Sequence, residues 1–200
     1  MKKLMLIALF GVFSSSFAFA ESVEWQLDNA HSTVGFVAKH FMISKVRGSF
    51  TEFSGKIMAD PESGKLASAE GTVKIASVDT ANAKRDEHLK AADFFDAEKY
   101  PEMKMITKSV VFDGDAMKVE ADLTIKDVTK PVTLDGEYLG AAIIDFGDGP
   151  VNRSGFTLRT VINRKEFGLN FAAVANGKTV VSDDIEIVLE FEILKPAAKE

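Results

Sequence analysis

The chain has 200 residues, and its 30 acidic side chains outnumber 24 basic ones to give a formal net charge of −6. A length of this kind fits one domain with a core large enough to stabilise it. The acidic balance disfavours nucleic acid and anionic membrane surfaces as partners. Because there is no cysteine, the sequence excludes disulfides and a thiolate nucleophile.

The first twenty residues predict a cleaved signal peptide. Lys2 and Lys3 precede an uncharged apolar run, residues 4–12, and residues 18–20 (AFA) form a small-x-small cleavage site before Glu21. The apolar run is shorter than the ~20 residues that span a bilayer, so a removable leader is favoured over a membrane anchor. Losing two of the 24 lysines and arginines leaves 22 basic and 30 acidic residues, a mature formal charge of −8.

From Val23 onward the apolar residues recur with a period of two, which predicts β-strands. The first strand ends at the turn Asp28-Asn29, and residues 60–64 (DPESG) predict a hairpin turn. In this half of the chain the alternating runs are residues 23–27, 34–40, 46–50, 53–59 and 71–75.

Alternation returns after Pro101. The most regular strand is 117–125, in which apolar residues face one side and charged or polar residues the other. Residues 146–150 (FGDGP) predict a loop, and residues 195–200 predict a flexible tail after a domain that ends at 194. The alternating runs in this half are residues 103–111, 117–125, 131–138, 156–162 and 185–193.

About eight or more strands at hairpin spacing predict an all-β, antiparallel fold. A barrel of about eight strands is just wide enough to hold one small ligand. A β-sandwich with a filled core fits the same alternation, so the strand pattern by itself leaves the two architectures open.

Residues 78–101 (VDTANAKRDEHLKAADFFDAEKYP) interrupt the alternation and predict a short helix that begins near Thr80 or Asn82. A helix this short needs a docking surface, and two adjacent phenylalanines follow it. In one interpretation its polar residues point at a ligand; in the other Arg85 pairs with Asp86 or Asp93 and His88 only packs. The residues expected on one helical face are Arg85, His88, Leu89 and Ala92.

Four segments together resemble the motifs of the YceI-like family of small secreted bacterial proteins, in the family's order. They are WQLDNAHSTVGFVAKH (25–40), RDEHLKAADFFDAEKYP (85–101), LTIKDVTKPVTL (123–134) and INRKEFGL (162–169). The resemblance implies a lipocalin-like barrel over residues 21–194, in the periplasm, holding a polyisoprenoid or similar lipid such as an isoprenoid quinone. No stable membrane insertion is expected, because the leader is removable and no Cys follows its cleavage site.

The aromatic content suits such a ligand. Sixteen phenylalanines stand against two tyrosines and one tryptophan, and Phe offers apolar surface without a hydrogen bond. A dry core would use the same residues, so composition leaves tunnel and core open. With the resemblance, the predicted cavity wall is Phe36, Phe50, Phe94, Phe95, Met105, Phe156 and Leu158.

A lipid bound by non-directional burial needs a few polar groups to orient its head group at the open end. We expect the helix at the barrel mouth, with its two phenylalanines anchored inward. Arg164 has a second interpretation, in which it pairs with carboxylates to close the barrel end. The residues predicted near a polar or anionic head group are Arg85, His88, His40 and Arg164.

No catalytic or cofactor motif stands out. The three histidines lack metal-ligand spacing, there is no GxGxxG or P-loop, and Ser32 beside His31 is not a triad because neighbours on a strand point to opposite faces. His31 is expected to fix a turn. The resemblance implies a lipid-binding protein, and the residues add no sign of enzyme activity, metal or cofactor. A lipid-modifying hydrolase, or a stress-related partner-binding barrel with a full core, stays as an alternative, and a dimer is compatible with the sequence.

Overall fold

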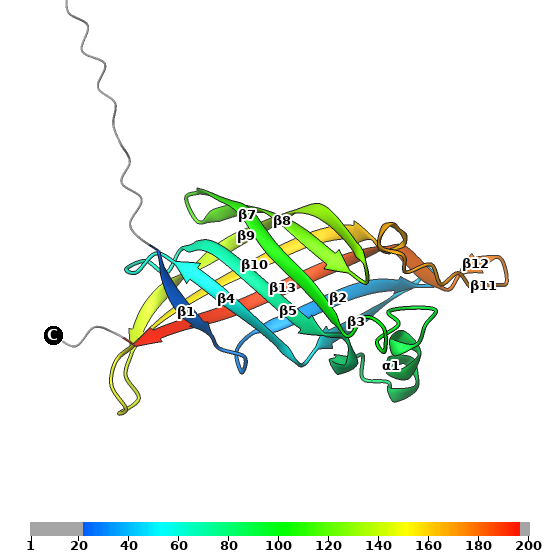
Figure 1. Ribbon diagram of the computed structural model, residues 1–200, viewed down its shortest axis with the longest axis horizontal. Helices are drawn as coiled ribbons and strands as arrows, with labels where there is room; N and C mark the ends of the chain where they lie inside the picture. Colours follow the sequence, from blue (N-terminus) through cyan, green and yellow to red (C-terminus); the bar gives the residue numbers. More distant parts are fainter. Residues whose placement is uncertain (1–21, 197–200) are drawn as a thin grey trace, which may run out of the picture.

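The computed structural model describes residues 22–196 and builds them mainly from antiparallel strands (Figure 1). The predicted signal peptide lies outside the described residues. The helices are η1 (Ile75–Ser77), α1 (Ala83–Lys90) and η2 (Arg164–Phe167). The strands are β1 (Val23–Leu27), β2 (Thr33–His40), β3 (Ser44–Phe50), β4 (Phe53–Ala59), β5 (Leu66–Lys74), β6 (Val78–Asp79), β7 (Glu102–Asp113), β8 (Ala116–Ile125), β9 (Val128–Ile144), β10 (Val151–Asn163), β11 (Val174–Ala175), β12 (Lys178–Thr179) and β13 (Val181–Pro196).

Eight of these strands form a closed antiparallel ring in the order β1-β4-β5-β7-β8-β9-β10-β13. The ring closes where Gln26 and Leu27 of β1 pair with Leu194 and Ile193 of β13. The predicted all-β barrel with a short helix is therefore confirmed, and the β-sandwich alternative is wrong.

Strand β13 holds the two sides of the barrel together. One of its edges pairs with β10 from Asp184 to Pro196. Its other edge pairs first with β2 and then with β1, so these two strands follow one another along β13 with only the turn 28–32 between them. The strand runs two residues into the segment predicted as a tail, because Lys195 and Pro196 pair with Asn152 and Val151.

The period of two places apolar side chains inside the barrel and polar ones outside. On β8 the five alternate residues that begin at Met117 are buried, whereas Lys118 and Glu120 between them are exposed. The buried side chains form two groups, one around Trp25 at the end of the barrel that holds the turn 60–65, and one around Phe94 at the end that holds α1. We call these the Trp25 end and the α1 end.

The wall of the barrel is split at the α1 end. Strands β9 and β10 are paired from Ile144↔Val151 as far as Asp135↔Arg159 and no further. Helix η2 follows β10 at this split, where Phe167 is buried and Lys130 Nζ lies 3.2 Å from Glu166 Oε2. Helix η2 therefore covers, with its side chains, a part of the wall where β9 and β10 are not joined by backbone hydrogen bonds.

Helix α1 begins where the sequence predicts. Asn82 is its N-cap, and the Asn82 side chain accepts a hydrogen bond of 3.0 Å from the amide of Arg85. The helix ends at Lys90, so Ala92 lies beyond it. Within residues 22–196, no helix is long and apolar enough to cross a bilayer.

Candidate functional site

A cavity of about 210 Å³ lies inside the barrel, towards the α1 end. Its lining combines inward-facing side chains of the barrel strands with the segment 89–95 that covers the α1 end, and apolar residues dominate it. All seven residues predicted for the wall line it: Phe36, Phe50, Phe94, Phe95, Met105, Phe156 and Leu158.

The seven wall residues differ in how much open space they face. Phe156 and Leu158 are fully buried and belong to the packed group around Trp25, so they form the floor of the cavity. Phe36, Phe95 and Met105 point inward but are only partly buried. An inward-facing apolar residue that keeps exposed surface borders an unfilled interior, so these three face the void itself.

We call the segment 89–95 the cover, and aromatic contacts hold it over the cavity. The ring of Phe94 stacks on Phe171 at 4.5 Å between centroids, and Phe95 meets the edge of Phe50 at 5.9 Å. The ring of His88 packs edge-on against both Phe94 and Phe171. Side-chain packing thus joins the segment 89–95 to the loop after η2, and one hydrogen bond of 3.1 Å, from Lys126 Nζ to the Phe94 carbonyl, joins it to the turn after β8. Such contacts are easier to open than a ladder of backbone hydrogen bonds.

Arg85 ties the start of α1 to the preceding strand. Its Nε donates to the Thr80 hydroxyl and its Nη2 to the Thr80 carbonyl, both at 2.7 Å. Asp86 accepts hydrogen bonds from the amide and the hydroxyl of Thr80. Arg85 does not line the cavity and forms no ion pair with Asp86 or Asp93 within the described residues, so its guanidinium serves the local structure.

The two histidines predicted at the head group lie outside the cavity lining. His88 Nε2 is 2.7 Å from Asp93 Oδ2 on the exposed side of the cover. His40 ends β2, and its ring lies 4.2 Å from that of Phe41. The structure therefore does not bring the histidines and Arg85 together at one site.

Arg164 is the one member of the predicted head-group set that lines the cavity. It is only 3% exposed, and it donates from Nε to the Ser182 carbonyl at 2.9 Å, from Nη1 to the Leu169 carbonyl and from Nη2 to Asp183 Oδ1 at 2.9 Å. Burial lowers the pKa of Arg164, and the charge of Asp183 opposes that shift. Its bonds join η2 to the start of β13, which is the structural role that the sequence left open.

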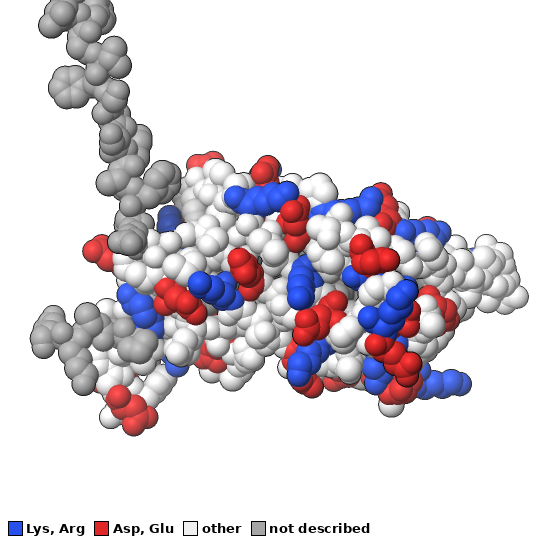
Figure 2. Space-filling view, viewed as in Figure 1, with Lys and Arg blue, Asp and Glu red and all other residues white. Residues whose placement is uncertain are grey.

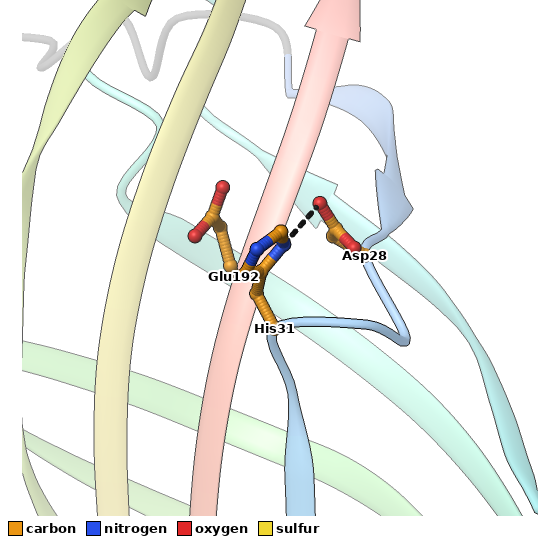
Figure 3. A group of neighbouring side chains, drawn as sticks. All are labelled: Asp28, His31 and Glu192. Carbon is orange, nitrogen blue, oxygen red and sulfur yellow. Dashed lines mark hydrogen bonds and ion pairs between the residues drawn. The ribbon is translucent and has the colours of Figure 1, made fainter.

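Asp28, His31 and Glu192 place metal-ligand atoms close together near the turn between β1 and β2 (Figure 3). His31 Nδ1 lies 3.0 Å from Asp28 Oδ2, which fits its expected place in a turn. The positive charge beside these carboxylates is the guanidinium of Arg153, whose Nη1 forms ion pairs with both Asp28 and Glu192. The arrangement is an ion-pair network that fastens β10 to β13 and the turn 28–32.

The same network shifts the pKa of Asp28. Burial raises that pKa, but hydrogen bonds with His31 and Arg153 outweigh burial, and the net result is a pKa below the usual value of 3.8. The Asp28 carboxylate is therefore held in its charged form.

Several lining residues were not predicted for the cavity wall. Leu89 was expected on the helical face, and the β13 residues Ile187 and Phe191 were expected on one strand face, but none was assigned to the wall. Gly55 and Gly71 also line the cavity, and a glycine's place in a wall depends on which strands pair. Strand pairing was not predicted.

Comparison with known proteins gives a consistent result. The family model of the YceI-like domain matches residues 25–193. A UPF0312 protein of Staphylococcus aureus is 36% identical over 169 residues, which covers 83% of this chain and 95% of that protein. The crystal structure of a YCEI protein from Campylobacter jejuni is 36% identical with a TM-score of 0.68, and the match covers 80% of this chain and 90% of that one. A polyisoprenoid binding domain from Saccharophagus degradans has the same fold at 15% identity, with a TM-score of 0.59 over 86% of this chain and 98% of that one.

Proposed function

The chain belongs to the YceI-like family, and on that premise we propose that it binds one long-chain apolar lipid, a polyisoprenoid or an isoprenoid quinone, inside its barrel. The observation that carries the proposal is the cavity of about 210 Å³ with its largely apolar lining. Such a lining favours a hydrocarbon by burial worth about 25 cal/mol per Å² and offers few groups to a polar ligand. The polyisoprenoid binding domain of Saccharophagus degradans supports the same ligand class through its shared fold.

The size of the cavity adds a requirement. Pockets for small molecules usually measure about 300–1,000 Å³, so a long lipid needs more room than 210 Å³. The cover can provide it, because Leu89, Phe94 and Phe95 are held by packing and line the cavity directly. We therefore expect the cover and the partly buried wall residue Phe36 to shift when the lipid enters.

The polar end of the lipid would lie near the α1 end. Arg164 lines the cavity there and carries a permanent charge, whereas Arg85 is bonded to Thr80 and lies outside the lining. A head-group role for Arg85, His88, His40 and Arg164 stays a prediction, and the geometry favours Arg164 among them.

Native mass spectrometry of protein purified from its host tests the proposal. The expected result is a mass increment that disappears after organic extraction and matches a prenyl lipid in the extract. A protein that is free of lipid after gentle purification and takes up neither a prenyl alcohol nor a quinone would contradict it. A bound lipid that is chemically altered on incubation would instead favour the hydrolase.

The proposed site of action is the periplasm, where a soluble carrier of apolar lipid would serve between two membranes. Support comes from the predicted signal peptide, residues 1–20, and from the small-x-small site before Glu21. N-terminal sequencing of the protein from the periplasmic fraction should begin at Glu21. A chain that begins at Met1, or one recovered only with membranes, would overturn this part of the proposal.

A further inference from the structure

The hairpin of β11 and β12 projects from the α1 end of the barrel, and β2 ends near its base (Figure 1). The turn 41–43 joins β2 to β3, and the hairpin of β11 and β12 lies beside it, held by a hydrogen bond of 3.0 Å from the Phe41 amide to the Val180 carbonyl. Three apolar side chains on these turns are exposed: Met42 by 50%, Ile43 by 75% and Val174 by 69%. We call these three residues the apolar tip.

The two segments that carry the apolar tip have a charge opposite to that of the whole chain. Residues 37–47 and 171–180 contain Lys39, Lys45, Arg47 and Lys178 and no acidic residue, although the net charge is −6. In the part of the chain that the structure describes, none of the four forms an ion pair. Figure 2 shows the outer end of β11 and β12 without charged side chains on the viewed side.

The apolar tip lies at the same end of the barrel as the cavity cover. Ala38 lines the cavity four residues before Met42, and Val181 lines it at the start of β13, where it pairs with His40. Phe171, in the loop that leads to β11, stacks on Phe94 of the cover. A surface that contacts the tip would therefore lie against the end of the barrel that the cover closes.

We propose that the apolar tip docks the barrel reversibly on the surface of a bilayer that contains anionic lipid. Exposed apolar side chains flanked by lysines and arginines bind the membrane interface, where affinity grows with apolar area and with attraction to anionic headgroups. The overall acidic charge keeps the rest of the molecule off the same surface and so fixes its orientation. The inference stands apart from the proposed function, because the tip docks whether or not the cavity holds a lipid.

Vesicle flotation tests the docking. A chain that starts at Glu21 is mixed with vesicles of phosphatidylcholine that contain about one-third phosphatidylglycerol, and with vesicles of phosphatidylcholine alone. The chain should float with the anionic vesicles and less with the neutral ones. The double variant Met42→Ser/Ile43→Ser should lose about tenfold in partitioning. The matched control Ile143→Ser/Phe146→Ser, which removes apolar residues 67% and 84% exposed at the Trp25 end, should bind like the wild type.

A second double variant separates the contribution of charge to binding from that of apolar contact. Lys45→Gln/Lys178→Gln should weaken binding to the anionic vesicles and reduce its dependence on salt, with no effect on neutral vesicles. Failure of the wild type to float with anionic vesicles, or equal losses in the tip variant and the Trp25-end control, would overturn the inference. Native mass spectrometry of the tip variant, with its lipid content unchanged, would show that such a failure leaves the proposed function intact.

Discussion

Gly71 on β5 lies directly opposite Gly55 on β4, and the two glycines leave the cavity wall bare at this level. A Cβ atom added to Gly71 would have no closer neighbour than the Ser54 carbonyl oxygen at 4.0 Å, whereas one added to Gly55 would lie 2.9 Å from the Glu70 carbonyl. Gly71 is therefore a position where a side chain can be added into open space.

We predict that Gly71→Leu reduces lipid uptake by filling part of the cavity. The free energy of unfolding should change by less than about 1.5 kcal/mol, because the added atoms enter a void and do not overpack a core. Titration with a fluorescent prenyl ligand and urea unfolding measure the two effects. Gly155→Leu is the control, since Gly155 faces outward against Leu139 and should leave uptake unchanged. A loss of several kcal/mol with unchanged uptake would show that this part of the interior is full.

Leu158, by contrast, is a poor place to block the cavity. It is fully buried, and its side chain already lies close to Gly136, so Leu158→Trp would overpack the floor. A loss of uptake there would follow from unfolding and would say nothing of the void.

Arg85→Ala should weaken binding of a prenyl diphosphate and of the matching prenyl alcohol equally. The reason is that Arg85 holds Thr80 at the start of α1 and does not reach the cavity. Its loss should cost about 1 kcal/mol of stability through the missing hydrogen bonds. Lys84→Ala, an exposed neighbour on the same helix, serves as control. A loss confined to the diphosphate would place Arg85 at the head group after all.

Arg164→Met should destabilise the protein by about 3 kcal/mol. The substitution removes a buried guanidinium and leaves the Ser182 and Leu169 carbonyls without their donor. Arg164→Lys keeps the charge but not the fork of three bonds, so most of the loss should persist. Chemical unfolding measures this cost. Binding of the prenyl diphosphate is then compared at a temperature where both variants are folded. If Arg164 also binds a head group, Arg164→Lys should bind the diphosphate more tightly than Arg164→Met. Equal affinities would show that Arg164 has a structural role alone.

Stability should fall on acidification through the Asp28 network. Because the folded pKa of Asp28 lies below its ordinary value of 3.8, the stabilisation is fully present above pH 3.8 and is lost as the pH falls through the folded pKa. Asp28→Asn should lower the unfolding free energy at pH 7 and make it less dependent on pH between 5 and 3. Urea titrations at pH 7, 5 and 3 check this. An unchanged pH dependence in the variant would show that other carboxylates control the acid response.

The strands were predictable because each one exposes one face to water. In β8, Met117 and Lys118 begin an alternation of buried and exposed residues, which needs only that one face of the strand is buried and the other is in water. The predicted strand, 117–125, differs from the observed Ala116–Ile125 by one residue. The helix was predictable for a similar reason, since the Asn82 cap is a local interaction. Strand pairing depends on long-range register, which no local pattern contains, so a barrel was expected only from resemblance to a family and its closure between β1 and β13 was not predicted.

The same distinction explains the site. Inward-facing phenylalanines such as Phe36 can be recognised from alternation, and they do line the cavity. The positions of the polar side chains could not be predicted, because a long arginine side chain such as that of Arg85 or Arg164 can reach several different hydrogen-bond partners. Their bonds to Thr80 and to the Ser182 carbonyl follow from the three-dimensional meeting of α1, η2 and β13. Nothing in their spacing predicts those partners.

Strand β13, which pairs with β10 on one edge and with β2 and β1 on the other, leaves the ribosome after every other strand of residues 22–196. Until Val181–Pro196 is available, β1, β4, β5, β7, β8, β9 and β10 can pair as one curved sheet and β2, β3 and β6 as a second, smaller one, because only β13 joins the two. The borders of both sheets then have unsatisfied backbone groups. Closure then joins residues more than 150 positions apart, such as Thr33 and Glu190, and contacts of that separation are slow to form. A chain cut short before Val181 should thus accumulate as an open, aggregation-prone sheet, however well its first 180 residues are made.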